Sequence, residues 1–217
     1  VGVGGIDHTE GSLMQLRGQS VLVMGMGRSG VSAAEYAVSQ GARVTVTDLK
    51  EDSPQIKGAK HTYGQHIREQ FTGADLVIVS PGIPAASPDL VAAQTAGVPV
   101  ISELSFAAEI LQQRGIPIIA VTGTNGKSSV SWFIGQILKG AGHKVFVGGN
   151  FGTALTDLVA SGETPDFAVV EVSSYQLELP GNLAPLAAVV LNLAPDHLSR
   201  HGTMANYAKT KTDIFQN

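Results

Sequence analysis

The 217-residue sequence predicts an α/β fold with parallel sheets. Short apolar and β-branched runs alternate along the chain with stretches in which apolar residues recur every three or four positions. Glycine is frequent, at 26 residues, and aromatic residues make up only 6% of the chain. Strands that alternate with helices across tight glycine turns are typical of βαβ units, whose successive strands run parallel.

The first half of the chain alternates strand and helix signals in this way. Between the first two predicted strands, apolar residues share one face of a helix that stops at Gly41. Ser87-Pro88-Asp89 predicts another helix start, because it offers a cap, a proline for the first turn and an acid near the positive end of the helix dipole. That helix ends near Gly97. The apolar runs predicted to be strands are 21–24, 44–47, 76–79 and 98–101.

A second α/β series is predicted to begin at Gly115, after a helix over 104–113. We therefore expect two domains, 1–113 and 114–217. Further strands are predicted at 118–121, 144–147, 167–172 and 187–193, and further helices at 128–139 and 203–215. The first of these helices carries an apolar stripe that we expect to face the core: Val130, Phe133, Ile134, Ile137 and Leu138.

Composition and charge exclude several classes of protein. The net charge is −4, with 14 Lys and Arg against 18 Asp and Glu, so nothing predicts a nucleic-acid partner. No apolar run is long enough for membrane insertion, and residues 1–19 lack the basic and apolar stretches of a signal peptide. Because cysteine is absent, disulfides and thiol chemistry are impossible, which fits a cytoplasmic protein.

The clearest functional signal is the glycine-rich turn at 121–129, Val-Thr-Gly-Thr-Asn-Gly-Lys-Ser-Ser. It joins a predicted strand to a predicted helix, where backbone amides can surround phosphate oxygens and the helix dipole favours anions. Lys127 can reach the β- and γ-phosphates of ATP, and Ser128 can bind magnesium. The common spacing would place a glycine at Val121, and the nearer Gly123 replaces it. A plain αβ turn with a surface lysine is the alternative, but it leaves the coincidence of these features unexplained.

A second glycine-rich turn, Gly25-Met26-Gly27-Arg28-Ser29-Gly30, also joins a strand to a helix. Asp48 ends the next strand, near the spacing at which Rossmann-like domains place the acid that binds a ribose. This pattern predicts a Rossmann-like nucleotide-binding domain, with NAD as the default ligand and a UDP group as the competitor. Tight packing of the turn is the alternative to ligand binding.

Two further strand ends carry side chains that suit a metal ion. Glu171 ends one predicted strand, and His197 follows another, next to Asp196. Because α/β folds bind ligands at the carboxyl ends of strands, Glu171 is a candidate magnesium ligand and His197 a candidate metal or phosphate contact. Helix capping by Glu171 and a structural role for His197 are the alternatives. Lys209 and Lys211 lie on the last predicted helix, where periodicity alone gives them no function.

Six stretches of the chain carry a family resemblance: 23–30, 79–84, 121–129, 147–152, 171–178 and 191–202. They resemble the Mur ligase family, and within it the enzymes that add D-glutamate to UDP-N-acetylmuramoyl-L-alanine. The Gly-Thr-Asn-Gly-Lys-Ser turn marks the wider superfamily, whereas Ser-Ser-Tyr-Gln-Leu-Glu and the Rossmann-like first domain indicate the D-glutamate branch. The sequence departs from the family at Ala194-Pro195, where a more polar pair is usual, and at Ser199, where an acid is common.

The resemblance implies two sets of binding residues. The ATP-binding residues would be Gly123, Thr124, Asn125, Gly126, Lys127, Ser128 and Ser129. The residues that contact the UDP-sugar would be Gly25, Gly27, Arg28, Ser29, Gly30, Asp48, Lys50, Ser80, Pro81, Gly82 and Asn150.

The resemblance also implies metal-binding and catalytic residues. Mg²⁺ would be bound by Ser128, Glu171 and His197. In this family a lysine carries a carbamate, made with carbon dioxide, that helps to hold the magnesium ions. That lysine is Lys211, with Lys209 as the nearby alternative. Lys127, Lys211 and His197 would be the catalytic residues.

The implied activity is ATP-dependent amide bond formation in peptidoglycan synthesis, by a cytoplasmic and monomeric enzyme. ATP would phosphorylate the substrate carboxylate, and the amine of D-glutamate would attack the acyl phosphate. The family continues through the rest of a P-loop-type ATPase domain and a third domain. We therefore expect these residues to be a truncated form that does not complete turnover. The rival functions are an NAD-dependent oxidoreductase, which leaves the 121–129 turn unexplained, and a non-catalytic nucleotide-binding module.

Overall fold

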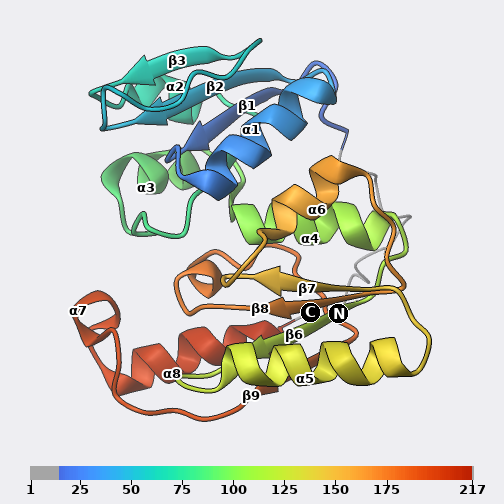
Figure 1. Ribbon diagram of the computed structural model, residues 1–217. Helices are drawn as coiled ribbons and strands as arrows, with labels where there is room; N and C mark the ends of the chain where they lie inside the picture. The colour runs from blue at the N-terminus through green and yellow to red at the C-terminus, as the bar shows by residue number, and fades with distance from the viewer. Residues whose placement is uncertain (1–14, 217) are drawn as a thin grey trace, which may run out of the picture.

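The computed structural model describes residues 15–216 and confirms the α/β fold. In this range, nine strands form two sheets, and all the pairs of neighbouring strands are parallel. Figure 1 shows the two sheets one above the other, with helices between them and on their outer faces. The signal-peptide prediction concerned residues 1–19, of which 1–14 lie outside the described residues.

The first sheet has the strand order β3-β2-β1-β4-β5, which is the order of a Rossmann-like fold. Its strands are β1 (Ser20–Met24), β2 (Arg43–Asp48), β3 (Lys60–Tyr63), β4 (Leu76–Val79) and β5 (Val100–Ser102). The central strands β1 and β4 are nearly continuous apolar runs because helices cover both faces of the sheet.

The second sheet has the order β7-β8-β6-β9. Its strands are β6 (Ile118–Thr122), β7 (Val145–Gly149), β8 (Phe167–Glu171) and β9 (Ala187–Val190). β6 and β8 are the buried central strands, whereas β9 is paired on one side only and is partly exposed. β9 is shorter than the predicted 187–193, because its continuation turns toward the loop after β6.

The helices form three layers around the sheets. They are α1 (Arg28–Ser39), α2 (Arg68–Thr72), α3 (Pro88–Thr95), α4 (Glu103–Gln113), α5 (Lys127–Gly140), α6 (Leu155–Ser161), α7 (Leu198–His201) and α8 (Met204–Thr212), with short 3₁₀ turns at Gln176–Glu178 and Asp213–Phe215. Helices α1, α4 and α6 lie between the sheets, and α5 packs against β6, β7 and β8 on the far face of the second sheet (Figure 1). Helix α8 contacts α7 and the 3₁₀ turn at Gln176–Glu178. One hydrophobic cluster therefore runs through the middle layer and includes residues of both sheets.

The apolar stripe predicted for α5 does not face the core as expected. Phe133 is 58% exposed and Ile137 is 71% exposed. The buried positions of this helix are Ser131 and Gly135. A Cβ atom at Gly135 would meet Val147 of β7 at 2.4 Å, so small residues allow the helix backbone to lie close against the sheet. Val130, Ile134 and Leu138 are partly buried, so the predicted stripe faces the sheet in part, whereas Phe133 and Ile137 are exposed.

Two further predictions concern the cap of α3 and membrane-spanning helices. Helix α3 begins at Pro88 as predicted, but the side chain of Ser87 makes no capping hydrogen bond. Within residues 15–216, every helix is too short or too polar to cross a membrane.

Candidate active site at the carboxyl ends of the second sheet

The carboxyl ends of the four strands of the second sheet meet at one edge. Val121 is in register with Glu171, and Glu171 with Gly149. Thr122 is in register with Val190. The glycine turn after β6, the acid that ends β8 and the segment that follows β9 are therefore neighbours, although up to 70 residues separate them in sequence. This is the edge at which parallel α/β sheets bind their ligands.

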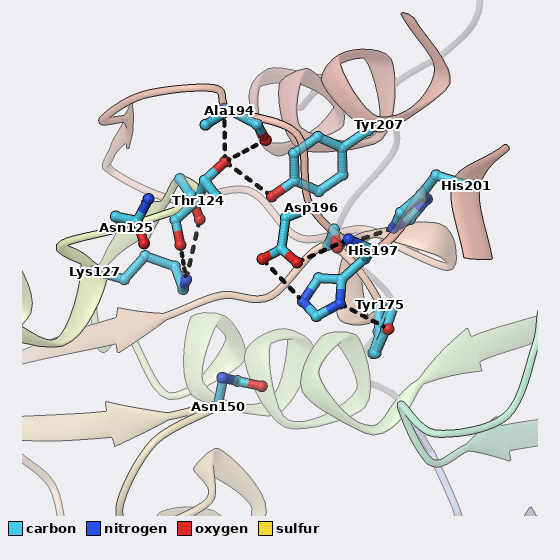
Figure 2. Close-up of polar contacts among 12 residues, drawn as sticks. Thr124, Asn125, Lys127, Asn150, Tyr175, Ala194, Asp196, His197, His201 and Tyr207 are labelled. Carbon is cyan, nitrogen blue, oxygen red and sulfur yellow. Dashed lines mark hydrogen bonds and ion pairs between the residues drawn. The ribbon is translucent and has the colours of Figure 1, made fainter. Parts of the chain in front are cut away.

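The turn after β6 wraps around the amine of Lys127. Its Nζ donates hydrogen bonds to the carbonyl oxygens of Gly123 and Thr124, both at 3.0 Å (Figure 2). Lys127 is also the first residue of α5, so the amides of the first helical turn and the ammonium group lie at the same place. Positive charge and free amide donors at a helix start favour an anion such as a phosphate.

Ser128, Glu171 and Asn150 form a polar cluster beside this turn. The hydroxyl of Ser128 donates to Oε2 of Glu171 at 2.6 Å, and Nδ2 of Asn150 donates to Oε1 at 3.1 Å. The backbone amide of Asn150 also donates to the carbonyl of Glu171 at 2.9 Å. A cavity of about 230 Å³, whose lining includes Ser128, Glu171 and the apolar Trp132, opens here. The cluster presents hydroxyl and carboxylate oxygens, which are the donors that hard cations prefer.

Lys211 is buried on the other side of the same turn, with 1% of its surface exposed. Its Nζ donates to the carbonyl of Gly123 at 3.0 Å and to Oγ1 of Thr122 at 3.3 Å. Burial lowers the pKa of Lys211 to about 8, and the nearby ammonium of Lys127 acts in the same direction. A lysine with a lowered pKa has a larger neutral fraction near pH 7 than a surface lysine, and the neutral amine is the nucleophilic form. Lys209, by contrast, is exposed and pairs with Asp213 at 3.5 Å.

The segment after β9 holds the turn in place. Oγ1 of Thr124 accepts from the amide of Ala194 at 3.0 Å and lies 3.0 Å from the hydroxyl of Tyr207 (Figure 2). The amide of Asn125 donates to Oδ1 of Asn192 at 3.0 Å, and Nδ2 of Asn192 donates back to the carbonyl of Asn125 at 2.9 Å. Because Ala194 acts through its backbone, the departure from a polar residue at this position costs none of these contacts.

His197 lies on a strained piece of backbone near these residues. Its φ angle is 51°, the only positive value at a non-glycine residue within 15–216. Nδ1 lies 3.1 Å from the hydroxyl of Tyr175, and Nε2 lies 3.4 Å from Oδ2 of Asp196 (Figure 2). The imidazole therefore contacts Tyr175 and Asp196, not the predicted partners Ser128 and Glu171. Among the described residues, no group of three or more His, Asp or Glu side chains is placed to hold a metal ion.

The glycine turn of the first sheet is fixed from two neighbouring strands. Oδ2 of Asp48 accepts from the amide of Met26 at 2.7 Å, and Oδ1 accepts from the amide of Lys50 at 2.9 Å. Ser80, after β4, donates its hydroxyl to the carbonyl of Gly25 at 2.8 Å. A Cβ atom at Gly30 would lie 2.0 Å from that carbonyl oxygen, so only glycine permits the helix to start so close to the strand. Both oxygens of Asp48 thus already accept backbone amides, one from the glycine turn and one from Lys50.

The remaining predicted binding residues lie at the surface of the turns. Gly27, Lys50, Gly82, Asn125, Gly126, Ser129 and Asn150 are exposed, and Ser29 and Pro81 are partly exposed.

Arg28 and Arg200 each connect the two halves of the chain. Arg28, predicted to touch the UDP-sugar, donates to Oδ2 of Asp157 at 2.8 Å and to the carbonyl of Gly152 at 3.3 Å. Arg200 donates to Glu178 and to the carbonyls of the loop after β4. Sequence reasoning gave no role to Arg200 or Glu178, nor to Tyr207 and Asn192. All four lie in or near the stretches that carried the resemblance, but no local pattern indicates which partner each side chain meets.

Both halves of the chain match known protein families. The Mur ligase MurD-like N-terminal domain matches residues 19–102, and the Mur ligase middle domain matches residues 121–217. The UDP-N-acetylmuramoylalanine–D-glutamate ligase of Geobacter metallireducens is 41% identical over 212 residues, 94% of this chain and 46% of that protein. The ligase of the same name from Anaeromyxobacter dehalogenans is 45% identical over 210 residues, 93% of this chain and 44% of that protein. The chain thus spans about half the length of these curated relatives.

Solved structures with more distant sequences share the fold. The UDP-N-acetylmuramate:L-alanyl-gamma-D-glutamyl-meso-diaminopimelate ligase from Neisseria meningitides is 19% identical, with a TM-score of 0.54 over 91% of this chain and 67% of that one. A murein peptide ligase from Psychrobacter arcticus is also 19% identical, with a TM-score of 0.51 over 91% of this chain and 47% of that one. The two family matches together account for both sheets and for nearly all the described residues. The chain therefore belongs to the Mur ligase family, of which it carries the MurD-like N-terminal domain and the middle domain.

Proposed function

We propose that this chain is the first part of an ATP-dependent ligase that adds D-glutamate to UDP-N-acetylmuramoyl-L-alanine in peptidoglycan synthesis. The observation that carries the proposal is the cluster at the end of the second sheet, where Lys127, Ser128, Glu171 and Lys211 surround one glycine turn. The names of relatives at 41% and 45% identity support the choice of substrates. The two domains divide near Gln113, and the enzyme acts as a cytoplasmic monomer.

The first sheet binds the UDP-sugar. Its glycine turn and the Ser80 turn lie close together, since Ser80 bonds to Gly25 at 2.8 Å. The start of α1 has no side-chain cap, so its free amides are available to the ligand. Asp48 holds the turn, since both of its oxygens already accept backbone amides. Arg28 is tied to Asp157 in this structure, so it reaches the substrate only if it leaves that exposed pair. Asn150 extends the substrate site to the second sheet, beside Glu171.

The second sheet binds ATP with magnesium. Gly123 to Ser129 surround the phosphates, and Lys127 exchanges its two carbonyl partners for phosphate oxygens. Ser128 and Glu171 would hold magnesium, because their hydroxyl and carboxylate oxygens, 2.6 Å apart, are donors that this ion prefers. Bound magnesium would neutralise the charge between the two anions that must meet. His197 would join this site only with its ring turned away from Tyr175.

Lys211 is the residue best suited to carry a carbamate. Carbamate formation joins a neutral amine to carbon dioxide and releases one proton, and burial lowers the pKa of Lys211 to about 8. The product would carry negative charge close to the Lys127 ammonium, which lowers that pKa further and would pair with the new group. Lys209, exposed and paired with Asp213, has no such environment.

The chemistry is amide formation from a carboxylate, which is a poor electrophile. Transfer of the γ-phosphoryl group to the carboxylate makes an acyl phosphate, and the D-glutamate amine displaces phosphate from it. Lys127 stabilises the charge that develops during the transfer, and the helix start of α5 holds the phosphates in line. No nucleophilic side chain is needed, which agrees with a site composed of Gly, Lys, Ser and Glu.

Ligand binding tests this proposal on the chain itself. Calorimetric titration with UDP-N-acetylmuramoyl-L-alanine and, separately, with ATP and magnesium should show binding of each to one site. Titration with NAD under the same conditions should show none. Binding of NAD in place of the UDP-sugar would refute the proposal and favour the oxidoreductase reading of the first glycine turn.

A further inference from the structure

A pair of side chains from the second half of the chain, Arg200 and Glu178, forms hydrogen bonds to the loop that follows β4. Arg200 donates from Nε and from one terminal nitrogen to the two carboxylate oxygens of Glu178, both at 2.8 Å. The same guanidinium donates to the carbonyl of Ile83 at 2.7 Å and to the carbonyl of Gly82 at 3.3 Å. Two hydrogen bonds from this planar group hold the loop, and the other two hold the group itself against Glu178.

Glu178 also bonds to the loop, as an acceptor where Arg200 is a donor. Its Oε2 accepts from the amide of Ala85 at 3.3 Å, so the pair binds two carbonyls and one amide of the same loop. The loop is itself a tight turn, in which the amide of Ile83 donates to the carbonyl of Ser80 at 3.1 Å. Ser80 in turn bonds to Gly25 at 2.8 Å. A movement of Arg200 would therefore be passed on to the first glycine turn through three hydrogen bonds: Arg200 to Ile83, Ile83 to Ser80, and Ser80 to Gly25.

The other side of Arg200 belongs to the site on the second sheet. Arg200 lies on α7, whose N-cap residue is His197. Its guanidinium carbon lies 5.0 Å from the centre of the Tyr175 ring, and the Tyr175 hydroxyl lies 3.1 Å from Nδ1 of His197. One side chain thus contacts the loop of the first sheet and the aromatic residue that holds His197.

The Arg200–Glu178 pair is more buried than the Arg28–Asp157 pair, and it is therefore the one that holds a fixed geometry. The side chains of Arg200 and Glu178 are 16% and 14% exposed, whereas the side chain of Arg28 in the pair with Asp157 is 68% exposed. Exposed pairs exchange readily with water and contribute little. The Arg200–Glu178 pair is bidentate and mostly buried, and the other donors of Arg200 also have partners. Opening this pair therefore costs much more free energy than opening an exposed pair.

We propose that Arg200 is a positioning residue, which sets the loop at 80–85, and through it the glycine turn that binds the UDP-sugar, at a fixed place relative to α7. It touches neither the UDP-sugar nor the phosphates of ATP. The inference rests on the proposed function, because it assigns the loop to UDP-sugar binding. Its consequence is that a residue of the middle domain controls the affinity of the first domain for its ligand.

The test compares two affinities in one chain. UDP-N-acetylmuramoyl-L-alanine and ATP with magnesium are titrated separately by calorimetry into the unchanged chain, Arg200→Ala, Arg200→Lys and Arg43→Ala. Arg200→Ala should weaken UDP-sugar binding by about tenfold or more, and leave ATP binding within about twofold. Arg200→Lys should resemble Arg200→Ala, because one ammonium cannot replace the planar fork. Arg43→Ala is the matched control: it removes an arginine bonded to Ser20 at the opposite end of the first sheet, and both affinities should stay unchanged.

Each outcome has one reading. Equal UDP-sugar affinity in the unchanged chain and Arg200→Ala would overturn the inference and leave the proposed function standing. Absence of UDP-sugar binding in the unchanged chain would instead overturn the proposed function. Equal weakening of both ligands would indicate a general structural role and also contradict the inference. If Arg200→Ala does not fold, Glu178→Gln answers the same question, since it keeps the shape and loses one charge-assisted bond; it should weaken UDP-sugar binding alone.

Discussion

Glu103, the first residue of α4, should make the stability of the protein depend on pH. Its side chain is 3% exposed and lies in the layer between the two sheets. Oε1 accepts from Nε2 of Gln176 at 3.3 Å, and Oε2 has no partner among the described residues. Burial raises the pKa of Glu103 from 4.5 to about 7; the bond from Gln176 opposes this, and the Asp157 carboxylate adds to it. The change we consider is Glu103→Gln, which keeps the shape and removes the titration.

The sign follows from proton binding. Between pH 4.5 and about 7 the folded chain keeps the proton on Glu103 and the unfolded chain has lost it. Unfolding then releases a proton, so the free energy of unfolding falls as the pH rises through this window. With about 1.4 kcal/mol for each pH unit between the two pKa values, Glu103 should cost about 3 kcal/mol above pH 7. The cost is absent below pH 4.5.

Urea unfolding of both chains between pH 5 and pH 8 measures this cost. The free energy of Glu103→Gln minus that of the unchanged chain should rise by about 2–3 kcal/mol across the range. Taking the difference cancels the other groups whose pKa values shift, such as Glu109 and His201. Glu35→Gln, on the exposed face of α1, is the matched control and should give a flat difference. A difference for Glu103→Gln that stays flat within about 0.5 kcal/mol would refute the reasoning.

Three further perturbations test other parts of the structure. Lys127→Ala, in a full-length ligase with these residues, should lower activity by roughly a hundredfold, because one electrostatic stabiliser of phosphoryl transfer is lost; turnover within a few fold of the unchanged enzyme would remove Lys127 from the mechanism. Gly30→Ala should cost about 3 kcal/mol in unfolding, since its Cβ would meet the Gly25 carbonyl at 2.0 Å, whereas Gly27→Ala, with nothing within 4 Å, should cost far less; equal costs would contradict the close approach. Tyr207→Phe, which removes the buried hydroxyl 3.0 Å from Thr124, should cost about 1 kcal/mol, and more than Tyr175→Phe, whose hydroxyl faces the exposed His197 ring.

The strands and helices with strong periodicity could be predicted from the sequence. The apolar runs at 21–24 and 76–79 are short, contain β-branched residues and precede turns, and these properties predict central strands of a parallel sheet. The strand β3 and the short helices α2, α6 and α7 were missed. Lys60–Tyr63 is a polar edge strand with one partner, and its pairing comes from tertiary contact with β2.

The part of the candidate site that could be predicted from the sequence is the glycine turn, because its proposed function requires a particular backbone conformation. The turn at 121–129 must be rich in glycine and must precede a helix to bind phosphate, and both properties are visible in the sequence. The burial of Lys211 was not visible, because a helix of nine residues with Lys209 and Lys211 has no strong apolar face. Only the approach of α8 to the hydroxyl of Thr122 and the carbonyl of Gly123 distinguishes the buried lysine from the exposed one. The same holds for Arg200, whose partners come from a loop more than a hundred positions earlier.

The left-handed backbone at His197 has a consequence for how this position can change over time. A φ of 51° costs a residue with a side chain about 1 kcal/mol or more, and glycine or asparagine would relieve that cost. If substitutions at this position were selected only for the stability of the protein, histidine would therefore be replaced. Persistence of the imidazole in a lineage would require selection on something other than folding. Substitutions at His197 can be ranked once by the stability of the protein and once by the growth of the cells. If histidine ranks low for stability and high for growth, selection for function has kept it.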